Sequence, residues 1–104
     1  MGSKSYRLRV LPLFEEDLNG IVDYIAFALQ NPDAAERLVD AVEEAIMERL
    51  PFAESFEPFR SARERKYPYY RIPVKNYTVF YVVIGDIVEV RRILYSGRDW
   101  RNMI

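Results

Sequence analysis

The 104-residue chain contains no cysteine and no histidine. Without cysteine it can form neither a disulfide nor a thiolate metal site, and a cysteine nucleophile is excluded. Without histidine it lacks the usual general base at neutral pH and the commonest metal ligand. Any acid–base chemistry would therefore have to use arginine, lysine, tyrosine, carboxylate or hydroxyl side chains.

Long apolar runs are also missing. No stretch approaches the roughly 20 apolar residues that cross a bilayer, and the N-terminus lacks the apolar region of a signal peptide. We therefore expect a cytoplasmic protein without membrane contacts. Half of the residues are hydrophobic, enough for a packed core, and the length predicts a single domain spanning residues 1–104.

The net charge of −1 conceals an uneven distribution. Up to Phe59 the chain has 5 basic and 12 acidic residues, whereas from Arg60 onward it has 10 basic and 4 acidic residues. Such asymmetry indicates a basic surface that binds an anionic partner, or acidic helices that neutralise a basic sheet within the molecule. The charge pattern leaves both interpretations open.

The C-terminal third has the composition of three β-strands. Aromatic and β-branched residues predict strands near 69–74, 77–84 and 87–95. Lys75-Asn76 separates the first two runs. Gly85-Asp86 separates the last two, and glycine at the first central position suits a type II′ turn with positive φ.

Two features predict where these strands lie in the sheet. Pro73 has no N–H to donate, so the strand that contains it should lie at an edge. The run from Tyr77 to Ile84 is apolar on both alternating faces, which predicts a central strand covered on both sides.

The N-terminal half predicts one strand and two helices. Apolar residues alternate in 6–11, as in a strand with one buried face, and then recur at helical spacing from Phe14 to Leu29. Asn31 followed by Pro32 is typical of an N-cap and first helical residue, and Pro51 ends the second helix.

The order β-α-α-β-β-β predicts an α+β fold. A helical hairpin should pack on one face of a mostly antiparallel four-stranded sheet. We expect the other face to be uncovered and to carry arginines.

The second predicted helix also carries an acidic stripe. Like charges at this spacing repel, and no histidine is present to complete a metal site. The stripe is typical of a solvated helix face, and we expect no metal and no cofactor. Its members are Glu36, Asp40, Glu44 and Glu48.

Three segments in this order resemble the RelE/ParE superfamily of bacterial type II toxin–antitoxin toxins. They read DLNGIVDYIAFALQNPDAAERLVDAVEEAI, YRIPVKNYTVFYVV and VRRILYSGRDW, and the likeness extends from Tyr6 to Trp100. It implies a RelE/ParE-like fold and a growth-inhibiting toxin of a plasmid-stabilisation module, neutralised by a cognate antitoxin. RelE-like members are mRNA interferases that cleave mRNA on the ribosome, whereas ParE-like members inhibit DNA gyrase by binding it.

If the chain is RelE-like, the resemblance implies a catalytic set. Its members would be Arg71, Lys75 and Arg98, with Tyr95 the nearest candidate for the tyrosine of those nucleases. Two departures weaken this interpretation, because Thr78 and Pro73 occupy positions where the nucleases have basic residues. A neutral hydroxyl cannot replace a guanidinium at a developing dianion, so the sequence favours the ParE-like alternative.

For target or antitoxin binding, the candidates share a cationic or aromatic side chain in or after the predicted sheet. They are Arg71, Arg91, Arg92, Arg98 and Trp100. The adjacent Arg91 and Arg92 should point to opposite faces unless a bulge intervenes.

Other interpretations stay open. These arginines can solvate the sheet, and Arg98 can pair locally with Asp99. The chain can also be an inactive protein-interaction module of the same fold. The target, DNA gyrase or ribosome-bound mRNA, and the oligomeric state are not determined by the sequence.

Overall fold

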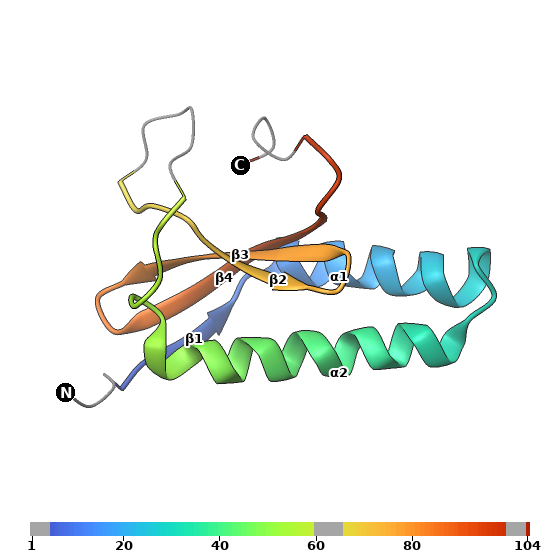
Figure 1. The fold of residues 1–104 in the computed structure, drawn as a ribbon, viewed down its shortest axis with the longest axis horizontal. Helices are drawn as coiled ribbons and strands as arrows, with labels where there is room; N and C mark the ends of the chain where they lie inside the picture. Colours follow the sequence, from blue (N-terminus) through green and yellow to red (C-terminus); the bar gives the residue numbers. More distant parts are fainter. Residues whose placement is uncertain (1–4, 60–65, 100–103) are drawn as a thin grey trace.

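The computed structural model describes residues 5–59, 66–99 and 104. The order of elements is the predicted β-α-α-β-β-β (Figure 1). The strands are β1 (Arg7–Val10), β2 (Tyr70–Val74), β3 (Tyr77–Ile84) and β4 (Ile87–Tyr95). The helices are α1 (Pro12–Asp23), continued by the π-helical segment Tyr24–Ala28, and α2 (Pro32–Arg49), followed by the 3₁₀ turn Leu50–Phe52.

The four strands form one sheet in the order β1-β4-β3-β2. β1 runs parallel to β4, and the other neighbours are antiparallel. The sheet is therefore mixed and mostly antiparallel. As predicted, β2 with Pro73 lies at an edge, and β3 lies inside the sheet.

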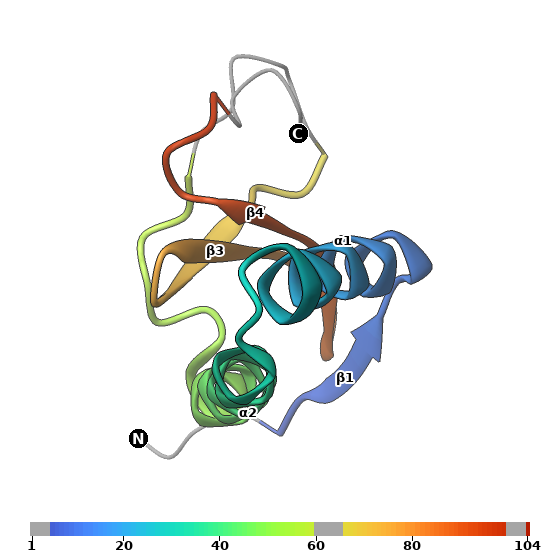
Figure 2. The same cartoon turned by 90° about the vertical axis from the view of Figure 1, so that its right-hand side faces the viewer.

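The two helices lie on one face of the sheet, as Figure 2 shows end on. The Ala34 N–H donates to Asn31 Oδ1 at 3.1 Å, so Asn31 caps α2 and Pro32 begins it. The cap at Asn31 and the helix start at Pro32 were both predicted from the sequence. Within the part of the chain that the structure describes, no helix is long and apolar enough to cross a membrane.

The last turns of the first helix are π-helical. The Leu29 N–H donates to Tyr24 O at 3.0 Å, which closes the wider π turn. The helix hairpin then turns at Gln30, which has a φ of 52°. Because a π turn shifts the angular position of the residues after it, Leu29 leaves the apolar stripe expected from the sequence and is exposed.

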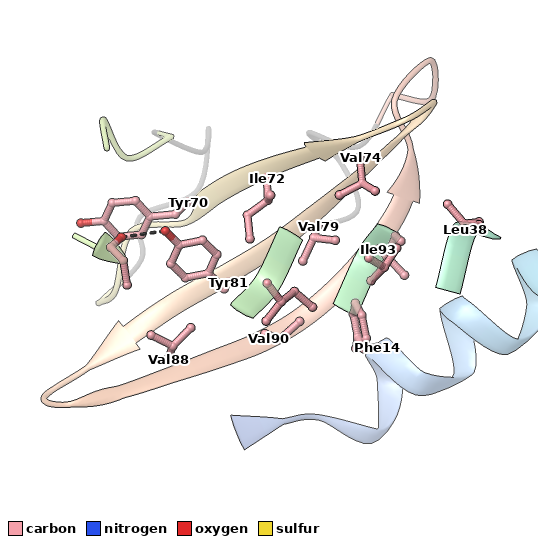
Figure 3. Close-up of a cluster of buried hydrophobic side chains, with 13 residues drawn as sticks. Phe14, Leu38, Tyr70, Ile72, Val74, Val79, Tyr81, Val88, Val90 and Ile93 are labelled. Atoms are coloured by element: carbon pink, nitrogen blue, oxygen red, sulfur yellow. Dashed lines mark hydrogen bonds between the residues drawn. The ribbon is translucent and has the colours of Figure 1, made fainter. Parts of the chain in front are cut away.

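The main core lies between the helices and the sheet (Figure 3). Alternate residues of β2, β3 and β4 face Phe14 of α1 and Leu38 of α2. The rings of Tyr70 and Tyr81 stack with centroids 5.1 Å apart, and the Tyr81 hydroxyl donates to Ala53 O at 2.6 Å. The sheet residues of this core are Tyr70, Ile72, Val74, Val79, Tyr81, Val88, Val90 and Ile93.

The opposite face of the sheet is covered too, so the expectation of an uncovered face was wrong. Phe80, Val82 and Leu94 are buried there and form a second, smaller core together with Tyr69 and Ile104. The segment after α2 returns across this face, and the Phe59 N–H donates to Tyr69 O. The prediction that β3 is covered on both sides is confirmed.

The two hairpin turns differ in backbone strain. Gly85 has a φ of 64°, as predicted for a glycine at the first central position of a type II′ turn. Lys75 occupies the same left-handed region with a φ of 53°. Because a side chain with Cβ is disfavoured there, the β2–β3 turn holds Lys75 in a strained conformation.

Candidate functional site

Arg92 is bound inside the molecule. Its Nε lies 2.7 Å from Asp17 Oδ2, and its Nη2 lies 3.0 Å from Asp17 Oδ1. Both side chains are largely buried. The hydrogen bond to Asp17 raises the pKa of Arg92, against the lowering effect of burial. The ion pair between Arg92 and Asp17 links β4 to α1.

A β-bulge decides where the two adjacent arginines lie. Phe80 pairs with Arg92, whereas the next residue, Tyr81, pairs with Val90. Arg91 is therefore the extra residue on β4, and the simple alternation of faces is interrupted at this point. Val90 and Ile93, on either side of the arginine pair, both belong to the main core.

Arg91 is bound to Glu89 on the same strand. Its Nε donates to Glu89 Oε1 at 2.8 Å, and Arg9 of β1 donates to Glu89 Oε2 at 2.9 Å. Burial alone would raise the pKa of Glu89, but the hydrogen bonds and charges of the two arginines outweigh it and lower this pKa. At Arg91 and Arg92, the charge asymmetry of the sequence is thus neutralised within the molecule.

Arg71 and Tyr95 project from opposite faces of the sheet. Arg71 pairs with Phe80 on the face of the second core, and its guanidinium lies 5.0 Å from the centroid of the Phe59 ring. Tyr95 pairs with Tyr77, on the helix side, with ring centroids 6.0 Å apart. The structure therefore does not bring Arg71 together with Tyr95.

Lys75, Tyr95 and Arg98 gather at one end of the sheet. Ser96 follows β4 and joins the β2–β3 turn, because its N–H donates to Asn76 O at 2.9 Å. The Arg98 N–H donates to Tyr95 O at 3.0 Å in a turn. Trp100, the remaining candidate, lies outside the described residues.

An open groove of about 860 Å³ lies at this end, between the first helix and the end of β4. Three tyrosines and several aliphatic residues form most of its wall, with Glu16 and Arg98 as its charged residues besides the paired Asp17. Two of the tyrosines are half exposed, Tyr24 at 57 % and Tyr95 at 51 %. The groove is lined by Glu16, Asp17, Gly20, Ile21, Tyr24, Leu29, Tyr77, Ile93, Leu94, Tyr95 and Arg98.

The three tyrosines are close enough to affect one another. Burial first, and then the neighbouring Tyr24 and Tyr95, raise the pKa of Tyr77. The Tyr77 phenol is therefore neutral at physiological pH, and the three side chains offer hydroxyls and aromatic faces. An exposed surface of this composition is typical of protein recognition, in which tyrosine and arginine act as anchors.

The sequence predicted Tyr95 and Arg98 as site residues but not Tyr24, Glu16 or Leu29. The signal for Tyr24 was present, because it falls off the helical stripe of apolar residues. Its meaning was hidden, because only the tertiary structure places the first helix beside the end of β4 to form the groove. Within the described residues, no group of acidic side chains is arranged to hold a metal ion.

Comparison with known proteins gives a consistent result. A family model described as the ParE toxin of the type II toxin–antitoxin system parDE matches residues 8–100. A solved structure described as a chromosomal ParDE toxin–antitoxin system from P. aeruginosa has a TM-score of 0.67 and 17 % identity, covering 86 % of this chain and 95 % of that one.

A second solved structure is an archaeal RelE–RelB complex from Pyrococcus horikoshii OT3. It has a TM-score of 0.52 and 16 % identity, covering 91 % of this chain and 99 % of that one. At these identities, both structures support the fold alone. A search of curated proteins found no match.

Proposed function

The chain belongs to the ParE toxin family of type II toxin–antitoxin systems, and we propose that it arrests growth by binding DNA gyrase without cleaving RNA. A cognate antitoxin would neutralise it by covering the groove beside Tyr95. The family match supports the toxin role. The choice of binding over cleavage rests on how the candidate residues are arranged.

The separation of Arg71 from Tyr95 carries this choice. Cleavage through a 2′-hydroxyl requires a proton acceptor, a proton donor and a cation around one phosphate, each within hydrogen-bonding reach. Arg71 lies on one face of the sheet, whereas Tyr95 and Arg98 line a groove on the other. This separation disfavours assembly of the four-residue nuclease set around a single phosphate and supports binding over cleavage.

The groove is the surface we assign to the antitoxin. Both structures compared above were solved as complexes or systems of toxin with antitoxin, which supports a tightly bound partner here. The aliphatic wall with tyrosines at the rim suits one face of a helix. Tyr24, Tyr95 and Arg98 would be its anchors in an interface of roughly 1,500–2,500 Å².

Two assays on the purified chain test the proposal. We expect inhibition of gyrase-catalysed supercoiling, and no cuts by primer extension on mRNA under translation. Codon-phased cuts that disappear in both Arg71→Ala and Arg98→Ala would establish a RelE-like nuclease instead. Normal growth at high expression, with neither effect in vitro, would identify an inactive interaction module.

A further inference from the structure

A hollow of about 360 Å³ lies between the last turns of α2 and the edge strand β2. It shares no lining residue with the groove beside Tyr95. Most of its wall is aliphatic or aromatic, and Glu48 and Arg49 are its charged residues. The hollow is therefore a second surface feature, with an apolar lining and one cation.

Arg49 is held in place at the wall of this hollow. Its guanidinium lies 3.5 Å from the centroid of the Phe56 ring, and its Nη1 donates to Arg71 O and to Tyr81 Oη, each at 3.1 Å. The Tyr81 hydroxyl is itself fixed, because it donates to Ala53 O at 2.6 Å. A guanidinium held in this way is preorganised, so a ligand that binds it orders little further side-chain freedom.

The charge of Arg49 has no acidic partner among the described residues. The ion pairs within those ranges involve Arg7, Arg9, Arg91 and Arg92 instead. Both hydrogen bonds of Arg49 come from Nη1, so within the same ranges its Nε and Nη2 have no acceptor. These two nitrogens form the fork that binds both oxygens of a carboxylate.

Exposed aromatic rings flank this cation. Phe52 is 52 % exposed and Phe56 is 48 % exposed, although both are large apolar side chains. Ile72 and Pro73 continue the apolar wall on β2. A cation among exposed rings is typical of a protein-binding surface, because a partner that covers the rings also excludes water from the charged contact.

We propose that the hollow binds a segment of a partner polypeptide in which one carboxylate side chain lies between large aliphatic residues. The carboxylate accepts hydrogen bonds from Nε and Nη2 of Arg49, and the aliphatic side chains cover Phe52 and Phe56. The inference rests on the surroundings of Arg49, outside the groove that we assign to the antitoxin. It stands whether or not gyrase is the target.

Charge selects an acidic polypeptide over a nucleic acid. Glu48, the second charged residue of the wall, is exposed and repels further negative charge. A nucleic acid strand carries successive phosphates and is bound by several cations, whereas this wall supplies one. A single carboxylate on an apolar segment matches the single guanidinium and its apolar surroundings.

The test uses a capped synthetic peptide, Ser-Leu-Glu-Leu-Ser, titrated into the full chain labelled with ¹⁵N. We expect saturable shifts of the Arg49 Nε resonance and of the Phe52 amide, with a dissociation constant on the order of 1 mM. The Tyr95 amide in the groove should not shift and serves as an internal reference. A peptide with glutamine in place of glutamate should bind at least about tenfold more weakly, because it lacks the charge.

Paired variants separate the charge from the apolar wall. Glu48→Gln should strengthen peptide binding about threefold by removing a repelling charge, whereas Glu44→Gln, exposed and outside the hollow, should have no effect. Phe52→Ala should weaken binding at least about fivefold, whereas Met47→Ala, 57 % exposed and also outside the hollow, should not. These changes at exposed positions test the site even if Arg49→Gln, which should abolish binding, does not fold.

Several results would overturn the proposal. These are no binding at millimolar peptide, equal binding of the glutamate and glutamine peptides, or shifts confined to the groove at Tyr95 and Arg98. A short thymidine oligonucleotide that binds at Arg49 more tightly than the peptide would identify a nucleic acid site instead. None of these measurements involves gyrase, so a failure to inhibit gyrase is distinguishable from a failure of this inference.

Discussion

Arg92 and Asp17 lie 75 positions apart in the chain and meet through two hydrogen bonds of 2.7 and 3.0 Å. The same carboxylate accepts the Ile93 N–H at 3.2 Å. β1 pairs with β4 only as far as Val90, so among the described residues no strand lies beside the outer edge of β4 beyond that point. Asp17 of α1 accepts the Ile93 N–H in place of a neighbouring strand, and this hydrogen bond connects the helix to the sheet.

Asp17→Asn should therefore destabilise the fold. It leaves Arg92 with a partly buried, unpaired charge, and we expect a loss of about 2–4 kcal/mol in the free energy of unfolding by urea denaturation. Glu16→Gln is the matched control one residue earlier, on an exposed position, and should cost less than about 0.5 kcal/mol. Equal effects of the two changes would contradict the structural role of the pair.

Glu89 should make stability depend on acidic pH. Its pKa is lower in the folded state than the ordinary pKa of a glutamate side chain, so its ionised form stabilises the fold above that ordinary pKa. The stabilisation is lost as pH falls through the folded pKa. Glu89→Gln should cost about 2 kcal/mol at pH 7 and flatten the loss of stability below about pH 4.5.

The measurement is the free energy of unfolding from pH 7 to pH 2. Glu44→Gln, on an exposed position of α2, is the control and should keep the parent profile. A Glu89→Gln profile that runs parallel to the parent across the acidic range would show that Glu89 contributes nothing to it.

The two hairpin turns predict substitutions of opposite sign. Lys75→Gly should stabilise the fold by about 1 kcal/mol, because glycine relieves the strain at a φ of 53°. Gly85→Ala should destabilise it by about 1 kcal/mol for the same conformational reason. A Cβ at Gly85 would meet no atom within 4 Å, so steric clash plays no part. Thermal melts of both variants check the signs.

Arg49 is predicted to be irreplaceable by lysine. Its guanidinium lies 3.5 Å from the centroid of the Phe56 ring and donates to both Tyr81 Oη and Arg71 O at 3.1 Å. A lysine keeps the charge but loses the planar stacking and one of the paired bonds. We expect Arg49→Lys to cost about 1–2 kcal/mol in urea unfolding, whereas the exposed Arg37→Lys should be neutral.

The groove is tested by antitoxin affinity. Tyr95→Ala removes a half-exposed ring from its rim and should weaken binding of the antitoxin at least about tenfold by calorimetry. Met47→Ala, an equally exposed apolar residue outside the groove, should bind as the parent chain does. Unchanged affinity in Tyr95→Ala would place the antitoxin on another surface.

Much of the architecture was determined by local sequence. The strand β1, the helical periods, the Asn31 cap, the edge position of Pro73 and the turn at Gly85 were all predicted, although all four residues of β1 are exposed and the one buried face expected for it was wrong. Each depends on residues within one or two turns of chain, where periodicity and backbone preference suffice. The ordered segments that resemble the toxin superfamily carried the family assignment for the same reason, since they preserve the order of elements.

Tertiary structure alone decided how the charges and the site are arranged. One extra residue at Arg91 alters the alternation of β4, and Arg92 finds its partner on a distant helix. A π turn takes Leu29 off the predicted apolar stripe and to the groove, and the segment ending at Phe59 packs on a face that we expected to be uncovered. These outcomes depend on contacts between residues far apart in the chain, and no local pattern records which distant groups will meet.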